Sequence, residues 1–137
     1  MILVDGTAWI EYLRATGSQV DARVGELLAG DEPIGVTDLV LMKVLAGARD
    51  DAHRDRLRRL LARCARLTVD APADYERAAD LHRGCRDAGV RIRHLPECLV
   101  AVVAMRHGAS VLHSDPDFDT LAGCSALVID PVAPAGA

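Results

Sequence analysis

Short, mostly apolar runs alternate with longer segments of helical periodicity along this chain. The runs are three or four residues long and are flanked by polar or turn-forming residues, which is typical of buried strands. They cover residues 2–4, 33–36, 67–69, 111–113 and 127–129. The longer segments carry apolar residues three and four positions apart and predict helices over residues 8–14, 20–29, 38–47, 50–64, 73–88 and 96–108. This alternation predicts an α/β protein with a central parallel sheet and helices on both faces.

Two of the predicted helices differ in how much of their surface is apolar. Residues Cys98–Met105 are almost wholly apolar, so their helix is expected to be buried on all sides and packed against the sheet. The helix over residues 73–88 has a single apolar face, on which we expect Tyr75, Ala78, Ala79 and His82 to be buried. We interpret His82 as a core histidine with satisfied hydrogen bonds and not as a ligand.

The composition is that of one globular domain of 137 residues with a net charge of −4. A molecule of this charge binds nucleic acid only through a local basic surface. One Phe, one Trp and two Tyr leave almost no stacking platform of the kind used by single-strand binders. Among the basic residues, Lys43 is the only Lys and all others are Arg.

Cysteine usage and the ends of the chain indicate a cytoplasmic protein. The cysteines are widely spaced and are expected to be free core thiols, which indicates an intracellular compartment; they are Cys64, Cys85, Cys98 and Cys124. Met1 leads directly into the first strand and leaves no room for a signal peptide. The longest apolar run is far shorter than a membrane span, so no membrane association is expected. The Pro/Ala/Gly-rich tail is expected to be frayed.

Carboxylates follow two predicted strands and begin the buried helix. Asp5 comes directly after the first strand, and the others are Glu97, in the first turn of the apolar helix, and Asp115 and Asp117, after the strand over residues 111–113. The carboxyl ends of parallel strands meet at one edge of a sheet, so these acids can converge in one pocket. Clustered carboxylates repel one another unless a cation lies among them, and oxygen ligands favour Mg²⁺ or Mn²⁺. The chemistry natural to such a site is metal-assisted phosphodiester hydrolysis, although each acid alone is also consistent with a helix cap or a turn.

Four segments then carry a wider pattern, in a fixed order along the chain. They are residues 1–14 (MILVDGTAWIEYLR), 40–49 (VLMKVLAGAR), 97–104 (ECLVAVVA) and 107–119 (HGASVLHSDPDFD). Together they resemble the PIN-domain toxins of the VapC family. The resemblance implies a single PIN-like domain over residues 1–137, an α/β/α sandwich with a central parallel sheet. It also implies a Mg²⁺-dependent endoribonuclease, usually a homodimer, that cuts structured RNA such as tRNA or ribosomal RNA and is silenced by a VapB-type antitoxin.

The resemblance further implies which residues are catalytic and hold the metal. The family's first-strand Asp corresponds to Asp5, the Asp that opens the buried helix corresponds to Glu97, and the last acids correspond to Asp115 and Asp117. Glu97 in place of Asp keeps the charge but lengthens the side chain by one methylene group, which alters the geometry offered to Mg²⁺. The family's remaining Glu, in the helix after the second strand, corresponds to Lys43.

Lys43 is the main departure from the family pattern. An ammonium group cannot ligate a metal, and about 4 Å from a carboxylate it gains roughly 4 kcal/mol at an effective dielectric constant of 20. It can therefore take the place of the cation, and we predict weakened metal binding and weak or absent RNA cleavage. An alternative assigns the missing acid to Asp38, one helical turn earlier and on a different face of the helix.

Two hypotheses from different classes therefore remain. The first is an RNA-cutting toxin attenuated by Lys43, which the surviving acids favour. The second is a catalytically inactive PIN-fold module that still binds its antitoxin, which Lys43 favours. For contacts with RNA, the candidates are the basic residues Arg59, Arg63, Arg91 and Arg93, and contacts with phosphates would make binding depend strongly on salt.

Overall fold

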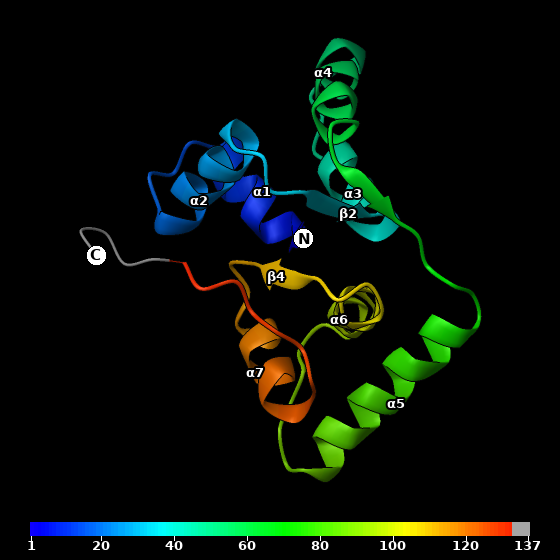
Figure 1. The fold of residues 1–137 in the computed structure, drawn as a ribbon. Coiled ribbons are helices and arrows are strands. Elements are labelled where there is room, and N and C mark those ends of the chain that lie inside the picture. Colours follow the sequence, from blue (N-terminus) through cyan, green and yellow to red (C-terminus); the bar gives the residue numbers. More distant parts are fainter. Residues whose placement is uncertain (133–137) are drawn as a thin grey trace.

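Parallel strands form the central sheet of the protein (Figure 1). The computed structural model describes residues 1–132, and the part of the expected frayed tail from residue 133 on lies outside the described residues. The strands within residues 1–132 are β1 (Ile2–Val4), β2 (Ile34–Thr37), β3 (Ala65–Leu67) and β4 (Ser110–Leu112), in the spatial order β3-β2-β1-β4. β1 pairs with both β2 and β4, so the first strand of the chain lies inside the sheet.

Helices cover both faces of this sheet, which confirms the predicted layers. In Figure 1, α1 (Gly6–Leu13) and α2 (Gln19–Ala29) lie on one side of β4, and α6 (Leu95–Arg106) and α7 (Pro116–Cys124) lie on the other. The segment after β2 forms α3 (Asp38–Ala46) and α4 (Asp51–Leu61). The remaining helix, α5 (Ala73–Asp87), packs against α6 and α7.

The core is built around β1 and α6. Every residue of β1 is buried, and on α6 the predicted all-round burial is confirmed, because each residue from Cys98 to Ala104 is buried. Trp9 from α1 and Phe118 from α7 are the largest fully buried side chains. Burial of a large apolar side chain contributes about 1.5–3 kcal/mol, so these contacts hold the strand ends in fixed positions.

Two strand positions predicted from the sequence are wrong. β3 begins and ends two residues earlier than the run over residues 67–69. It stops at Leu67 because its partner strand β2 ends at the paired residue Thr37, and the Thr68 carbonyl instead accepts a hydrogen bond from Arg106 (2.6 Å). The run over residues 127–129 forms only an isolated bridge, between Val111 and Ile129. Val128 in this run is 61% exposed, so the segment lies along the sheet without forming a regular strand.

The predicted buried face of α5 is confirmed only at Ala78. Tyr75 and Ala79 are exposed, and the buried side chains are Asp74, Ala78 and Cys85. The face is thus rotated by about one residue, because Asp74 is buried through its ion pair with Arg106 (2.8 Å). The rotation leaves His82 half-buried at the edge of a cavity.

Two further expectations concern the thiols and the membrane. All cysteines are free, and burial raises the pKa of the Cys98 thiol to about 11 and that of Cys85 to about 12. Within residues 1–132 no helix has the length and apolar character needed to cross a membrane.

The ion pair between Asp74 and Arg106 yields a test of the fold. Burial opposes the charge on Asp74, but hydrogen bonds from Arg106 and the Asp70 backbone outweigh it and hold the pKa of this carboxyl below its usual range. We expect Asp74→Asn to lower the free energy of unfolding at pH 7 by about 2 kcal/mol, below the 3–5 kcal/mol typical of fully buried pairs because Arg106 is partly exposed. The measurement is urea denaturation.

The pH dependence and a control complete this test. Because the pKa of Asp74 is lowered on folding, its contribution is present above the unfolded pKa of about 3.9 and is lost as pH falls through the folded value. The difference between wild type and Asp74→Asn is therefore expected to shrink as pH falls below about 4. Asp80→Asn, which removes an exposed pair with Arg83 on the same helix, is expected to cost under about 1 kcal/mol. Equal losses in both variants would contradict this account of α5.

Candidate active site

Asp5 lies where β1 and β4 end side by side. Its backbone N–H donates to the carbonyl of Leu112 (2.9 Å), which fixes the two strand ends together. Its side chain caps α1, since Oδ2 accepts from the backbone N–H (3.1 Å) and the hydroxyl (2.7 Å) of Thr7. Thr7 Oγ1 in turn accepts from the backbone N–H of Ser114 (2.9 Å). This chain of bonds brings the loop before Asp115 next to Asp5.

Glu97 and Lys43 form an ion pair at the same edge of the sheet. Glu97, in the first turn of α6, is only 3% exposed, and its Oε1 lies 2.6 Å from Lys43 Nζ on α3. Burial raises the pKa of Glu97, the negative charges of Asp5 and Asp115 raise it further, and Lys43 lowers it. The structure therefore brings Asp5, Lys43, Glu97 and Asp115 together, as the sequence predicts.

Two oxygens of this group carry no hydrogen bond to any residue from 1 to 132. They are Asp5 Oδ1 and Glu97 Oε2, and both are buried. A buried acceptor without a donor is costly, and a carboxylate more so. Two such oxygens among clustered acids are the surroundings that a hard divalent cation requires, so the residues present fit a metal ion of the kind implied by the family.

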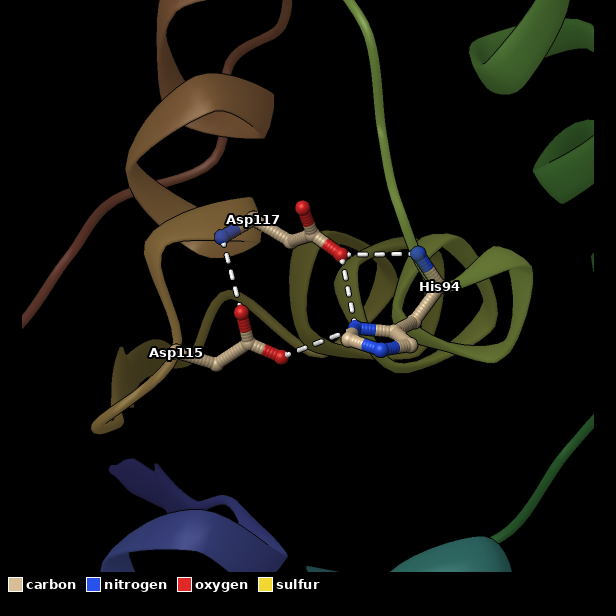
Figure 2. A group of neighbouring side chains, drawn as sticks. All are labelled: His94, Asp115 and Asp117. Atoms are coloured by element: carbon tan, nitrogen blue, oxygen red, sulfur yellow. Dashed lines mark hydrogen bonds and ion pairs between the residues drawn. The ribbon is translucent and has the colours of Figure 1, made fainter.

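Asp117 lies beside Asp115 and His94 at the start of α7 (Figure 2). Its carboxylate accepts from the backbone N–H groups of Arg93 (3.1 Å) and His94 (2.8 Å), and so fastens the segment before α6 to the start of α7. The imidazole Nδ1 of His94 lies 3.1 Å from Asp117 Oδ2 and 3.6 Å from Asp115 Oδ2. The structure thus groups His94, Asp115 and Asp117, with ligand atoms within 4.8 Å of one another.

His94 is a site residue that the sequence analysis missed. The sequence analysis assigns it no role, whereas in the structure it is the residue preceding the first turn of α6. A signal did exist, because a His three positions before Glu97 lies one helical turn from a candidate ligand. The alternative acid Asp38 is instead exposed and pairs with Arg66 (2.8 Å), so it does not replace the missing Glu.

The basic residues proposed for RNA contacts lie in two places. Arg93 is nearest to the acids, with Nε 3.8 Å from Asp117 Oδ1. Arg91, two residues earlier, lines a cavity of about 410 Å³ together with His82 and Arg86. Arg59 and Arg63 are exposed on or just after α4, where Arg63 donates to the carbonyl of Leu28 (3.1 Å).

Comparison with known proteins agrees with this arrangement. The sequence profile of the PIN domain matches residues 2–123. Ribonuclease VapC11 of Mycobacterium tuberculosis is 42% identical over 123 residues, which cover 89% of this chain and 92% of that protein. The chain therefore belongs to the PIN-domain family, and within it to the VapC ribonucleases.

Solved structures with lower sequence identity share the fold. One is VapBC2 of Rickettsia felis bound to a DNA fragment from its promoter, with a TM-score of 0.73, 16% identity, and coverage of 95% of this chain and 98% of that chain. Another is VapC20 of Mycobacterium tuberculosis, described as a sarcin–ricin loop cleaving toxin, with a TM-score of 0.58, 19% identity, and coverage of 93% and 99%.

The ion pair of Lys43 and Glu97 can be tested by a double-mutant cycle. Lys43→Met leaves the buried carboxylate of Glu97 without its cation. We therefore expect Lys43→Met to lower the free energy of unfolding at pH 7 more in the wild-type background than in a Glu97→Gln background. We expect a coupling energy of about 1–3 kcal/mol from urea denaturation without added metal, since Lys43 is itself 35% exposed. The exposed pair of Asp38 and Arg66 is the matched control, with coupling under about 1 kcal/mol. A Lys43–Glu97 coupling no larger than the control would mean that the pair is not formed in solution.

Proposed function

We propose that this chain is the toxin of a VapBC-type toxin–antitoxin pair, a metal-dependent endoribonuclease whose cleavage is attenuated by Lys43. The observation that carries the proposal is the 2.6 Å contact of Lys43 Nζ with Glu97 Oε1, close enough to Asp5 and Asp115 for their charges to raise the pKa of Glu97. The acids support a nuclease, and the ammonium group among them supports its attenuation.

The metal site of the proposal consists of carboxylate oxygens at the ends of β1 and β4 and the start of α6. Asp5 Oδ1 and Glu97 Oε2 are free to bind an ion, and Asp115 completes the group. A bound Mg²⁺ or Mn²⁺ supplies activation of a water molecule and stabilisation of the leaving oxygen of a phosphodiester. Thr7 orients Asp5 through its two hydrogen bonds, and Asp117 holds the Arg93–His94 segment beside the site.

Lys43 weakens such a site in two ways. Its ammonium group puts a positive charge beside the Glu97 carboxylate, which lowers the attraction of this carboxylate for a second cation. It also removes the oxygen ligand that the family places at this position, and a protonated amine cannot accept a proton from water. Both effects act on binding of the ion and on the chemical step, so we expect slow cleavage and not merely an altered RNA preference.

The proposed substrate is a structured RNA, tRNA or ribosomal RNA. Arg93 beside the acids and Arg91 in the neighbouring cavity are the basic residues best placed to contact phosphates that flank the cut. Arg59 and Arg63 on the α4 side would contact more distant phosphates. The activity described for VapC20 supports ribosomal RNA as one candidate.

The proposed partner is a VapB-type antitoxin, and the complex described for VapBC2 supports it. A groove of about 390 Å³ between α1, α3 and α4 reaches Lys43, and its lining combines apolar side chains, among them Ile10, Leu13 and Leu57, with the basic side chains of Arg14, Arg49 and His53. Its apolar side chains suit an amphipathic antitoxin segment, and an Arg of that segment would pair with the carboxylates beyond Lys43. Assembly as a homodimer and a cytoplasmic location belong to the same proposal.

A second candidate function is a binding module that has lost its chemistry altogether. The Lys43–Glu97 pair favours it, because the pair neutralises a metal ligand inside the folded protein. Such a module would keep the antitoxin groove and bind without cutting. The two candidates differ in whether restoring the acid at position 43 restores cleavage.

The deciding experiment measures cleavage of tRNA and ribosomal RNA with added Mg²⁺ or Mn²⁺ by three proteins: wild type, Lys43→Glu, and Lys43→Glu combined with Asp5→Ala. We expect Lys43→Glu to cut about 100-fold faster than wild type or more, because a metal site supplies several kcal/mol of transition-state stabilisation. The added Asp5→Ala is expected to abolish this gain.

Other outcomes would change the proposal. Rapid metal-dependent cleavage by wild type would show that the acids suffice and that Lys43 does not attenuate. Silence of all three proteins on RNA, with antitoxin binding retained, would favour the binding module.

A further inference from the structure

His94 is placed like a ligand and not like a surface histidine (Figure 2). Its side chain is 61% exposed, while its Nδ1 faces two carboxylates, Asp117 Oδ2 at 3.1 Å and Asp115 Oδ2 at 3.6 Å. The backbone fixes this arrangement, since the N–H of His94 also donates to Asp117 (2.8 Å). Asp115 is held in turn by the backbone N–H of Asp117 (3.0 Å).

The distances between these atoms match the edges of a metal coordination sphere. Ligands about 2.1 Å from an octahedral ion lie about 3.0 Å from one another when they are adjacent. For a tetrahedral ion with bonds of about 2.0 Å, the corresponding separation is about 3.3 Å. The separations of the two carboxylate oxygens from Nδ1, 3.1 and 3.6 Å, lie near these values, and all three ligand atoms lie within 4.8 Å of one another, a grouping that could hold one ion.

The unbonded oxygens of the neighbouring acids point independently to a cation here. Asp5 Oδ1 and Glu97 Oε2 are buried and have no donor within residues 1–132. Asp115 links them to His94, because it approaches both the imidazole and the Glu97 carboxylate. Glu97 also lies one helical turn beyond His94, with its backbone N–H donating to the His94 carbonyl (3.1 Å).

We propose that His94 is a metal ligand, which joins Asp115 and Asp117 and gives this centre a preference for Mn²⁺ and other transition-metal ions over Mg²⁺. The inference rests on the metal site of the proposed function and extends it beyond the all-carboxylate set that the family resemblance implies. Imidazole nitrogen binds first-row transition metals well, whereas Mg²⁺ selects oxygen and keeps its water.

Nearby positive charges oppose the binding of a divalent ion. Arg93 Nε lies 3.8 Å from Asp117 Oδ1, and Lys43 already pairs with Glu97, so two positive groups oppose a divalent ion. A ligand nitrogen therefore makes a larger difference to the affinity for the ion here than in a site without these charges. In the absence of metal, Nδ1–H donates to Asp117 and the same geometry is kept by a hydrogen bond.

Metal binding to the full-length protein tests the proposal without any RNA. Isothermal titration with Mn²⁺ and with Mg²⁺ is carried out on wild type and on three single variants: His94→Ala, His94→Asn and His107→Ala. We expect wild type to bind Mn²⁺ more tightly than Mg²⁺, and both His94 variants to lose about tenfold or more of the Mn²⁺ affinity with little change for Mg²⁺. Asn can still donate a hydrogen bond to Asp117, so its loss of affinity separates ligation from a purely structural role.

The control and a spectroscopic readout make the result specific. His107 lies at the opposite end of α6, with Nδ1 on the carbonyl of Val103 (2.9 Å), and His107→Ala is expected to leave both affinities unchanged. Electron paramagnetic resonance of bound Mn²⁺ is expected to detect coupling to an imidazole nitrogen in wild type, and this signal is expected to vanish in His94→Asn. Circular dichroism verifies that each variant is folded.

The titrations are repeated in a Lys43→Glu background, where the competing ammonium is absent. Each of three results would overturn the proposal. The first is a Mn²⁺ affinity that does not change on removal of His94 in either background. The others are lack of the nitrogen coupling and lack of Mn²⁺ binding in both backgrounds. These outcomes are distinct from failure of the proposed function, because a protein that binds Mn²⁺ through His94 and cuts no RNA would support the ligand and contradict the nuclease.

Discussion

Repulsion among buried carboxylates is the constraint on which this structure depends. Asp5 is fully buried, Glu97 nearly so, and Asp115 stands close enough to raise the pKa of Glu97. The apolar core forces this proximity, since burial of β1 and α6 fixes where the strand and helix ends meet. Folding therefore has to bring a positive charge to the same place, either as an ion or as a side chain.

Lys43 and Glu97 meet this requirement as a matched pair. The family resemblance implies a Glu at position 43 and an Asp at position 97, where this chain has Lys and Glu. The Glu97 carboxylate lies 2.6 Å from Nζ, while its second oxygen remains without a donor among the described residues. The two residues act on one carboxylate and are therefore best understood together.

Local sequence patterns predicted the layers of the fold because burial imposes short-range periodicity. The strand at Ile2–Val4 and the wholly buried Cys98–Ala104 are confirmed. The same reasoning failed for α5, where a long-range ion pair between Asp74 and Arg106 turned the helix and exposed Tyr75. A partner 32 positions away leaves no trace in the periodicity of the helix itself.

The candidate site likewise contains residues that the sequence predicts and one that the folded structure reveals. Strand-end acids are visible in the sequence, so the grouping of Asp5, Glu97 and Asp115 could be predicted, and the family pattern drew attention to Lys43. For His94 the sequence offers only its spacing from Glu97, because its place beside the acids depends on Asp117 accepting from two backbone N–H groups 23 and 24 residues earlier in the chain. Only the folded chain brings that imidazole to the acids.

The ammonium of Lys43 differs from a metal ion in being covalently tethered. A dissociable ion stabilises a protein according to its free concentration, so chelation or magnesium starvation withdraws that stabilisation. A tethered cation has a constant effective concentration beside Glu97, which does not change when the solution is diluted. At Glu97 Oε1, the compensating charge is consequently present whenever the chain is folded, whatever the free concentration of ions.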